Sequence, residues 1–184
     1  MKRIFVAVKI EPGEILASMI SSLKSGLRND SIKWTESSNI HITLVFLGNT
    51  EDGLVDKLSA KLKEECEGLG KFEIVLRGAG VFKSMNDPRV LWAGIEPSSQ
   101  LLQLNERLKS CLNELNIKIE DRPFKPHITI GRIKNVKNKE TLKSLVDKYQ
   151  NTEFQRIKVN EFILFESILL QRGPLYKEIS VIDL

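Results

Sequence analysis

The chain has 184 residues, of which 41% are hydrophobic and 28% are charged, a balance typical of globular proteins and not of disordered or fibrous ones. Its formal net charge of +4 comes from basic residues spread along the sequence, and it is too small to indicate nucleic-acid binding by itself. Cys66 and Cys111 are the only cysteines, which argues against a disulfide framework and favours a reducing compartment. The apolar N-terminal run is too short for a membrane span or a signal peptide, so we expect a cytoplasmic protein with no membrane partner.

The first half of the chain alternates between strand and helix patterns. Apolar runs rich in β-branched residues predict strands, and apolar residues at helical spacing predict amphipathic helices. Gly48 is expected to end the second strand, and Thr50 to cap the second helix. The expected elements are, in order, strand, helix, short extended piece, strand, helix and strand, at residues 4–10, 14–27, 32–34, 39–47, 50–68 and 72–82.

The second half repeats this order. The expected elements are strand, helix, short extended piece, strand, helix, further strands and a last strand, at residues 89–95, 98–115, 117–119, 124–133, 139–149, 154–165 and 175–184. Several short sequences also recur at nearly constant spacing. The matched segments, with offsets of 86, 85 and 86, are residues 3–7 and 89–93, 32–33 and 117–118, and 41–44 and 127–130. So small a drift indicates an internal duplication.

We therefore predict an α+β fold in which residues 1–184 form a single bilobal domain. The first repeat is expected over about residues 1–84 and the second over about 87–168, with a C-terminal strand at about 175–184 that completes the sheet. Two pseudo-symmetric lobes of antiparallel sheet would carry helices on the outside and enclose a central groove. The histidine-bearing strands of the two repeats are expected to face each other across this groove.

The candidate site is a four-residue phrase that occurs twice. His41-Ile-Thr-Leu and His127-Ile-Thr-Ile contain the only two histidines of the chain. On a strand, residues i and i+2 share a face, so each His and the following Thr point away from the buried Ile between them. One such histidine would most simply be a hydrogen-bonded core residue, and a strand threonine reflects β-propensity. Two matching phrases at equivalent points of a duplication favour a site.

Two histidines can divide the work of an acid–base reaction. Imidazole titrates near pH 6.5, so one ring can act as a base while another acts as an acid. In-line displacement at phosphorus needs a base on the attacking oxygen and an acid on the leaving oxygen, and a pseudo-two-fold axis places two histidines on opposite sides. Thr43 and Thr129 can donate hydrogen bonds to phosphoryl oxygens. Two distant histidines and two scattered cysteines do not form a plausible zinc set, so we expect no metal and no cofactor.

These phrases and their flanks, residues 39–48 and 123–132, closely resemble the two HxTx motifs of the two-histidine (2H) phosphoesterases. The branch that they resemble most is the RNA 2′,3′-cyclic phosphodiesterase or 2′-5′ RNA ligase-like family. The likeness extends over nearly the whole chain, including residues 3–7 and 80–92. The resemblance implies a duplicated bilobal fold and metal-independent hydrolysis of RNA 2′,3′-cyclic phosphate ends to 2′-phosphomonoesters. It also implies that His41 is the proton donor and His127 the proton acceptor, roles that the duplication by itself leaves open.

Other site residues follow from the resemblance and from position. Arg132 matches a motif-associated arginine and is expected to bind substrate phosphate. Strict alternation puts it on the face opposite His127, and a bulge at Gly131 would return it to the groove. Phe82 is a candidate for base stacking, although an aromatic residue in a strand is more often part of the core. Trp92 and Tyr176 are weaker candidates of the same kind.

Two further readings stay open. The same site could act as a 2′-5′ RNA ligase or on 2′-5′ oligonucleotides or related cyclic phosphates, or the chain could be a catalytically lapsed RNA-binding module. Intact His and Thr in both motifs argue against the lapsed module. The expected partners are RNA ends that carry 2′,3′-cyclic phosphate, or related cyclic nucleotides. We expect a monomer without an obligate protein partner.

Overall fold

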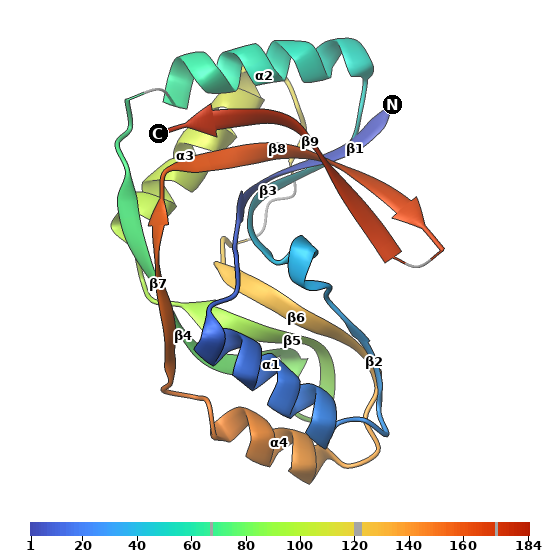
Figure 1. Cartoon of the computed structure of the whole chain (residues 1–184). Helices are drawn as coiled ribbons and strands as arrows, with labels where there is room; N and C mark the ends of the chain where they lie inside the picture. The colour runs from blue at the N-terminus through green and yellow to red at the C-terminus, as the bar shows by residue number, and fades with distance from the viewer. Residues whose placement is uncertain (67, 120–122, 172) are drawn as a thin grey trace.

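The computed structural model describes residues 1–66, 68–119, 123–171 and 173–184 (Figure 1). Nine strands, four α-helices and one 3-10 helix are assigned within these residues. They are β1 Lys2–Lys9, α1 Glu14–Gly26, β2 Ser31–Trp34, η1 Ser37–Asn39, β3 His41–Thr50, α2 Asp52–Cys66, β4 Phe72–Ser84, β5 Asp87–Ile95, α3 Ser99–Glu114, β6 His127–Asn135, α4 Lys139–Asp147, β7 Glu153–Val159, β8 Glu161–Leu170 and β9 Gly173–Asp183.

All nine strands belong to one sheet, in the order β7-β4-β5-β6-β3-β1-β8-β9, with β2 paired to β6. Every pairing is antiparallel. Figure 1 shows that the sheet curls, with the helices on its outer side. We call the inner side the concave face. The predicted α+β class with antiparallel strands and outer helices is confirmed, and the two lobes are the two wings of one continuous sheet that meet at β3 and β6.

The lobes do not coincide with the two halves of the sequence. Helix α1 of the first half packs against α4 and β7 of the second, whereas α3 of the second half packs against α2 and β3 of the first. Each wing therefore takes elements from both halves, and the chain crosses between the wings repeatedly (Figure 1). The apolar stripe of a helix does not indicate which wing of the sheet will cover it, so the sequence could not reveal that helices are exchanged between the wings.

The strand ladders correct one detail of the repeat alignment. Ala7 of β1 is paired with Thr43, and Trp92 of β5 is paired with Thr129. Ala7 is therefore the structural equivalent of Trp92, whereas the sequence match of residues 3–7 with 89–93 placed it opposite Ala93. Both strands are apolar on both faces, so the two sequences still look alike when they are aligned one residue out of register. In the structure, such a shift would move every side chain to the other face of the sheet.

The main core lies between the sheet and the helices. Its strand contribution includes Ile42 and Ile128, which are both fully buried. Removing such a side chain from water is worth about 1.5–3 kcal/mol. Cys66 of α2 and Cys111 of α3 are free thiols in this core, and burial raises the pKa of Cys66 to about 12. None of the helices in the described residues is long and apolar enough to cross a membrane.

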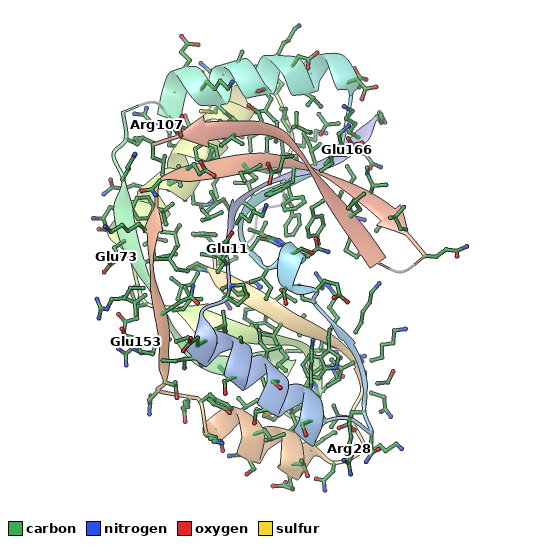
Figure 2. All side chains as sticks on the ribbon, in the orientation of Figure 1. Glu11, Arg28, Glu73, Arg107, Glu153 and Glu166 are labelled. Carbon is green, nitrogen blue, oxygen red and sulfur yellow. The ribbon has the colours of Figure 1, made fainter. Side chains whose placement is uncertain are left out.

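Two smaller features complete the frame. Thr50 ends β3 and donates a hydrogen bond from Oγ1 to the carbonyl of Gly48, 3.4 Å away, while α2 begins at Asp52. The prediction that Thr50 caps this helix is therefore wrong, because Gly48 at φ +73° allows the strand to continue past it. Along β4 and β7, the exposed Arg156 pairs with Glu153 at 2.9 Å and with Glu73 at 3.4 Å, and both glutamates are labelled in Figure 2.

Candidate active site

The two histidine strands are neighbours in the middle of the sheet, so the expectation that they face each other across a groove is wrong. β3 and β6 run antiparallel, and Ile42 is paired with Ile128. This register sets His41 beside Thr129 and Thr43 beside His127, because partners in an antiparallel ladder step in opposite directions. The isoleucine side chains are buried on the helix side, so the four polar side chains lie on the concave face. The structure thus brings together the His and Thr residues of both phrases.

A bulge follows the histidine phrase in each copy. The ladder between β5 and β6 shifts between Leu91 and Trp92, whose partners are Gly131 and Thr129, so Ile130 is an extra residue. Val90 is paired with Arg132 and lies two residues from Trp92, hence on the same face. The bulge therefore returns Arg132 to the concave face. This is the outcome predicted for a bulged strand, whereas strict alternation predicted the opposite face.

The equivalent bulge in β3 makes the two copies differ at one place. The ladder between β1 and β3 shifts between Val6 and Ala7, whose partners are Val45 and Thr43. Phe46 thereby reaches the concave face with 53% of its surface exposed, at the position that Arg132 has in β6. One end of the candidate site is cationic and the other is aromatic.

Each imidazole is fixed by a backbone carbonyl two residues earlier. Nδ1 of His41 lies 2.7 Å from the Asn39 oxygen, and Nδ1 of His127 lies 2.6 Å from the Lys125 oxygen. A carbonyl can only accept, so Nδ1 carries the hydrogen in both rings and Nε2 is the atom that can gain or lose a proton. His41 Nε2 lies 3.0 Å from Thr43 Oγ1. Among the described residues, His127 Nε2 has no such partner.

Burial sets the protonation of both rings. Desolvation lowers the pKa of His41 and of His127 below the ordinary value, and the backbone carbonyls oppose this only in part. The positive charge of Arg132 lowers both pKa values further, and His127 also lowers the pKa of His41. Arg132 is therefore close enough to act electrostatically on both rings. An anion bound between them would have the opposite effect.

Aromatic side chains surround each histidine. The rings of Phe5 and Tyr176 lie 5.1 and 5.2 Å from that of His41, and Tyr176 is edge-on to it. Phe82 is edge-on to His127 at 4.6 Å and lies 5.4 Å from Trp92. The three aromatic residues selected from the sequence, Phe82, Trp92 and Tyr176, are thus all beside the site, and the base-stacking role of Phe82 stays a prediction.

Sequence reasoning missed the aromatic surface beside His41. Phe5 and Phe165 stack at 5.2 Å and pack with Ala7 and Ile163 in a second apolar cluster, separate from the main core. Phe46 extends this surface, 5.9 Å from Phe5. The sequence places Phe5 and Phe46 in two separate predicted strands, and only the structure pairs them across β1 and β3. Predicting this pair would have required the bulge in β3, which the sequence alone did not place.

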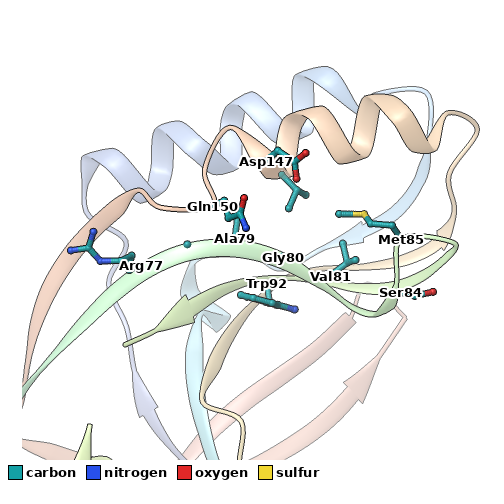
Figure 3. Close-up of a pocket in the computed structure, with 11 residues that line it drawn as sticks. Arg77, Ala79, Gly80, Val81, Ser84, Met85, Trp92, Asp147 and Gln150 are labelled. Carbon is teal, nitrogen blue, oxygen red and sulfur yellow. The ribbon is translucent and has the colours of Figure 1, made fainter. Parts of the chain in front are cut away.

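A cavity of about 420 Å³ lies between β4 and α4, where Ala79, Met85 and Gln150 line it (Figure 3). Trp92, which contacts Phe82 beside His127, also borders it. Neither histidine borders it. A much smaller hollow of about 30 Å³ adjoins His41 and is lined by Lys9, Asn39, Tyr176 and Glu178, among others. Within the part of the chain that the structure describes, no three metal-ligating side chains gather into a site.

Comparison with known proteins identifies relatives along nearly the whole chain. A family model described as the 2′-5′ RNA ligase superfamily matches residues 11–167. The chain is 32% identical to an RNA 2′,3′-cyclic phosphodiesterase of Methanothermobacter thermautotrophicus, over 99% of this chain and 98% of that protein. It is 33% identical to an RNA 2′,3′-cyclic phosphodiesterase of Archaeoglobus fulgidus, over 98% of this chain and 99% of that protein.

Solved structures share the same fold. A crystal structure of a Thermus thermophilus protein superposes with a TM-score of 0.82 at 28% identity, covering 99% of this chain and 97% of that one. E. coli LigT complexed with 3′-AMP gives a TM-score of 0.77 at 24% identity, covering 100% of this chain and 98% of that one. The curled antiparallel sheet with outer helices is therefore the architecture of these neighbours as well.

Proposed function

The chain belongs to the 2′-5′ RNA ligase superfamily, and from this premise we propose that it hydrolyses RNA 2′,3′-cyclic phosphate ends to 2′-phosphomonoesters. The observation that carries the proposal is the paired arrangement around Ile42 and Ile128. Two imidazoles present Nε2 on one face of a rigid sheet, and a threonine hydroxyl lies beside each. A phosphorus atom above the isoleucine pair has a proton-transfer group on each of two opposite sides.

The reaction is one in-line displacement. His127 takes a proton from water through Nε2 while the water oxygen bonds to phosphorus. The bond from phosphorus to O3′ breaks, and His41 gives its Nε2 proton to that oxygen, so the 2′-phosphomonoester remains. Thr43, Thr129 and Arg132 stabilise the charge on the non-bridging oxygens. Acid and base each contribute about 10²–10⁴ in rate, and neither step requires a metal.

The division of roles follows the resemblance, and an asymmetry in the site supports it. Thr43 Oγ1 lies 3.0 Å from His41 Nε2 and can accept the hydrogen of a protonated ring. His127 Nε2 has no partner among the described residues, so its lone pair is open to a water molecule. A protonated His41 that donates from Nε2 and a neutral His127 whose Nε2 is open to water are what this displacement needs.

The ribose must lie on the side of the acid, because it carries the leaving O3′. On the His41 side the terminal base meets the exposed ring of Phe46 and the half-buried Tyr176, with Phe5 buried beneath them. Phe82 touches the other histidine and therefore borders the attacking water. Phe82 stays a candidate for base stacking, and a separate role in orienting His127 also fits its contact.

The test is turnover of an oligoribonucleotide with a terminal 2′,3′-cyclic phosphate in the presence of EDTA. We expect a product with a 2′-phosphate, and a loss of about 10²–10⁴ in kcat for His41→Ala and for His127→Ala. Lys57→Ala on α2, with a lysine that takes part in none of the site contacts described, serves as control and should be unaffected. Loss of activity on chelation, or full activity of either histidine variant, would contradict the proposal.

A second candidate reaction uses the same site, and the description of the matching family favours it. A 5′-hydroxyl in place of water would bond to phosphorus as O3′ leaves, which joins two RNA ends through a 2′-5′ linkage. Adding a 5′-hydroxyl RNA and measuring the longer product decides between the two. Tight RNA binding with neither product would indicate a lapsed site. A cytoplasmic location, supported by the two free thiols, and a monomeric state remain predictions.

A further inference from the structure

Two cations stand side by side at one end of the candidate site. Lys33 of β2 is paired with Arg132 of β6 in an antiparallel ladder. Its neighbours Ile32 and Trp34 pack against the main core, so Lys33 points to the opposite, concave face. Arg132 reaches the same face through its bulge. β2 thus takes the place beside β6 that β3 occupies at the histidines.

This pairing is unfavourable without an anion. Like charges directly opposite each other on neighbouring strands destabilise a sheet. Neither Lys33 nor Arg132 forms an ion pair with any carboxylate of residues 1–66, 68–119, 123–171 or 173–184. A bound phosphate between them would turn the repulsion into two attractive contacts.

The same place lies against the other wing of the sheet. A Cβ atom on Gly173, where β9 begins, would be 3.7 Å from Lys33 Nζ. The adjacent Pro174 carbonyl accepts a hydrogen bond from Asn39 Nδ2 at 2.9 Å, which ties the start of β9 to the segment just before His41. Figure 1 shows strands β8 and β9 projecting beyond the rest of the sheet at this end. Lys33 therefore lies where the start of β9 comes close to β2.

We propose that Lys33, together with Arg132, binds the phosphodiester on the 5′ side of the terminal nucleotide, so that the RNA leaves the concave face past the start of β9. The inference rests on the proposed function, and it makes Lys33 the residue that separates RNA ends from free cyclic mononucleotides. A mononucleotide has no phosphodiester at this position. Arg132 also serves the reacting phosphate, whereas Lys33 serves only the next one.

The internal duplication suggests a second direction in which the RNA could leave the site. By the 85-residue offset the sequence counterpart of Lys33 is Lys118, an exposed lysine, and by the 86-residue offset the counterpart of Arg132 is Phe46. The counterpart pair therefore offers one cation, whereas Lys33 and Arg132 offer two. The paired charges therefore select the Lys33 end, and Lys118→Gln is a matched control that would reveal the opposite direction.

The experiment compares Lys33→Gln, Lys118→Gln and the unaltered protein on three substrates. These are adenosine 2′,3′-cyclic phosphate, the dinucleotide ApA with a terminal cyclic phosphate, and the same dinucleotide with a neutral methylphosphonate linkage. For Lys33→Gln we expect about a fivefold drop in kcat/KM on the charged dinucleotide, the scale of one partly exposed ion pair, and no change on the mononucleotide. The neutral linkage should lower kcat/KM of the unaltered protein by at least a similar factor, and it should have a smaller effect on Lys33→Gln, where Arg132 is the remaining cation of the pair.

Equal effects of Lys33→Gln on mononucleotide and dinucleotide, or no effect on either, would overturn the inference. A selective loss in Lys118→Gln in place of Lys33→Gln would overturn it too, because the RNA would then leave by the other end. If the unaltered protein turned over none of the three substrates, the proposed function would fail separately. In that case, the affinities of Lys33→Gln and Lys118→Gln for a dinucleotide that ends in 2′-phosphate would still test whether Lys33 contacts the phosphodiester.

Discussion

Ile42 is paired with Ile128 across the contact between β3 and β6, and each lies between the histidine and threonine of its own copy. A local two-fold axis therefore passes between the two isoleucines. The axis places the histidines on one diagonal of the site and the threonines on the other. Under the proposed mechanism, the two matching phrases act from opposite sides on a substrate that lies on this axis.

The symmetry is broken at Arg132, and its removal should be visible in two ways. Arg132→Gln removes a charge from the reacting phosphate, so we expect kcat/KM to fall about 100-fold or more. Arg132 also lowers the pKa of both histidines, so its loss raises both, and the pH optimum of kcat/KM should move upward. The measurement is kcat/KM across pH 5–9. Arg89→Gln, which changes an exposed arginine paired with Asp87, should alter neither quantity. A lower kcat/KM with an unmoved optimum would contradict the electrostatic part.

The unaltered protein should show different optima for kcat/KM and for kcat. Burial lowers the pKa of both histidines in the free protein, and the active form carries one proton on the pair. That form is most abundant midway between the two lowered values, so kcat/KM should peak below about pH 6.5. The negative charge of bound substrate raises both pKa values, so kcat should peak at higher pH. Coincident optima, or a flat profile for kcat/KM, would contradict two titrating imidazoles.

Much of this site could be predicted from strand alternation. The i, i+2 spacing of His and Thr places both side chains on the face opposite a buried isoleucine, and the structure has all four together on the concave face. The two bulges could not be placed with certainty, because two successive buried residues such as Leu44 and Val45 also fit an ordinary apolar strand. Yet these bulges decide which residues flank the site.

Long-range pairing was harder still. Lys33 looks like a solvated strand residue until β2 is found beside β6, which brings it next to Arg132. Phe5 and Phe46 likewise look like core residues in separate strands. In the sheet both lie on the face away from the helices, where Phe5 is buried in the second apolar cluster and Phe46 is exposed. Local patterns specify the face of a strand, and only the complete sheet specifies its neighbours.

Substitutions of the two phenylalanines beside the site should change different kinetic constants. Phe46→Ala removes the exposed ring proposed to meet the terminal base, so KM should rise about fivefold or more, since a stacked base is worth about 1–3 kcal/mol. Phe82→Ala removes the ring that contacts His127 edge-on, so kcat should fall while KM changes less. Steady-state kinetics on one cyclic-phosphate dinucleotide measures both. If Phe82→Ala raised KM and Phe46→Ala did not, the terminal base would lie on the His127 side.

The indole of Trp92 packs so close to Gly80 that no larger residue fits there. A Cβ atom at this position would lie 2.2 Å from Cζ2 of Trp92, which is paired with Gly80 on the neighbouring strand. Gly80→Ala must displace that ring, and we expect the free energy of unfolding to fall by about 1–3 kcal/mol.

Gly53→Ala is the matched control, because Gly53 lies within α2 and a Cβ atom there meets nothing within 4 Å. It should raise the free energy of unfolding by about 0.5–1 kcal/mol, as alanine favours the helix. Urea denaturation gives both values, and an unchanged midpoint for Gly80→Ala would show that Trp92 can move without loss. Since Trp92 also contacts Phe82 beside His127, the displaced ring should lower kcat at temperatures where the variant remains folded.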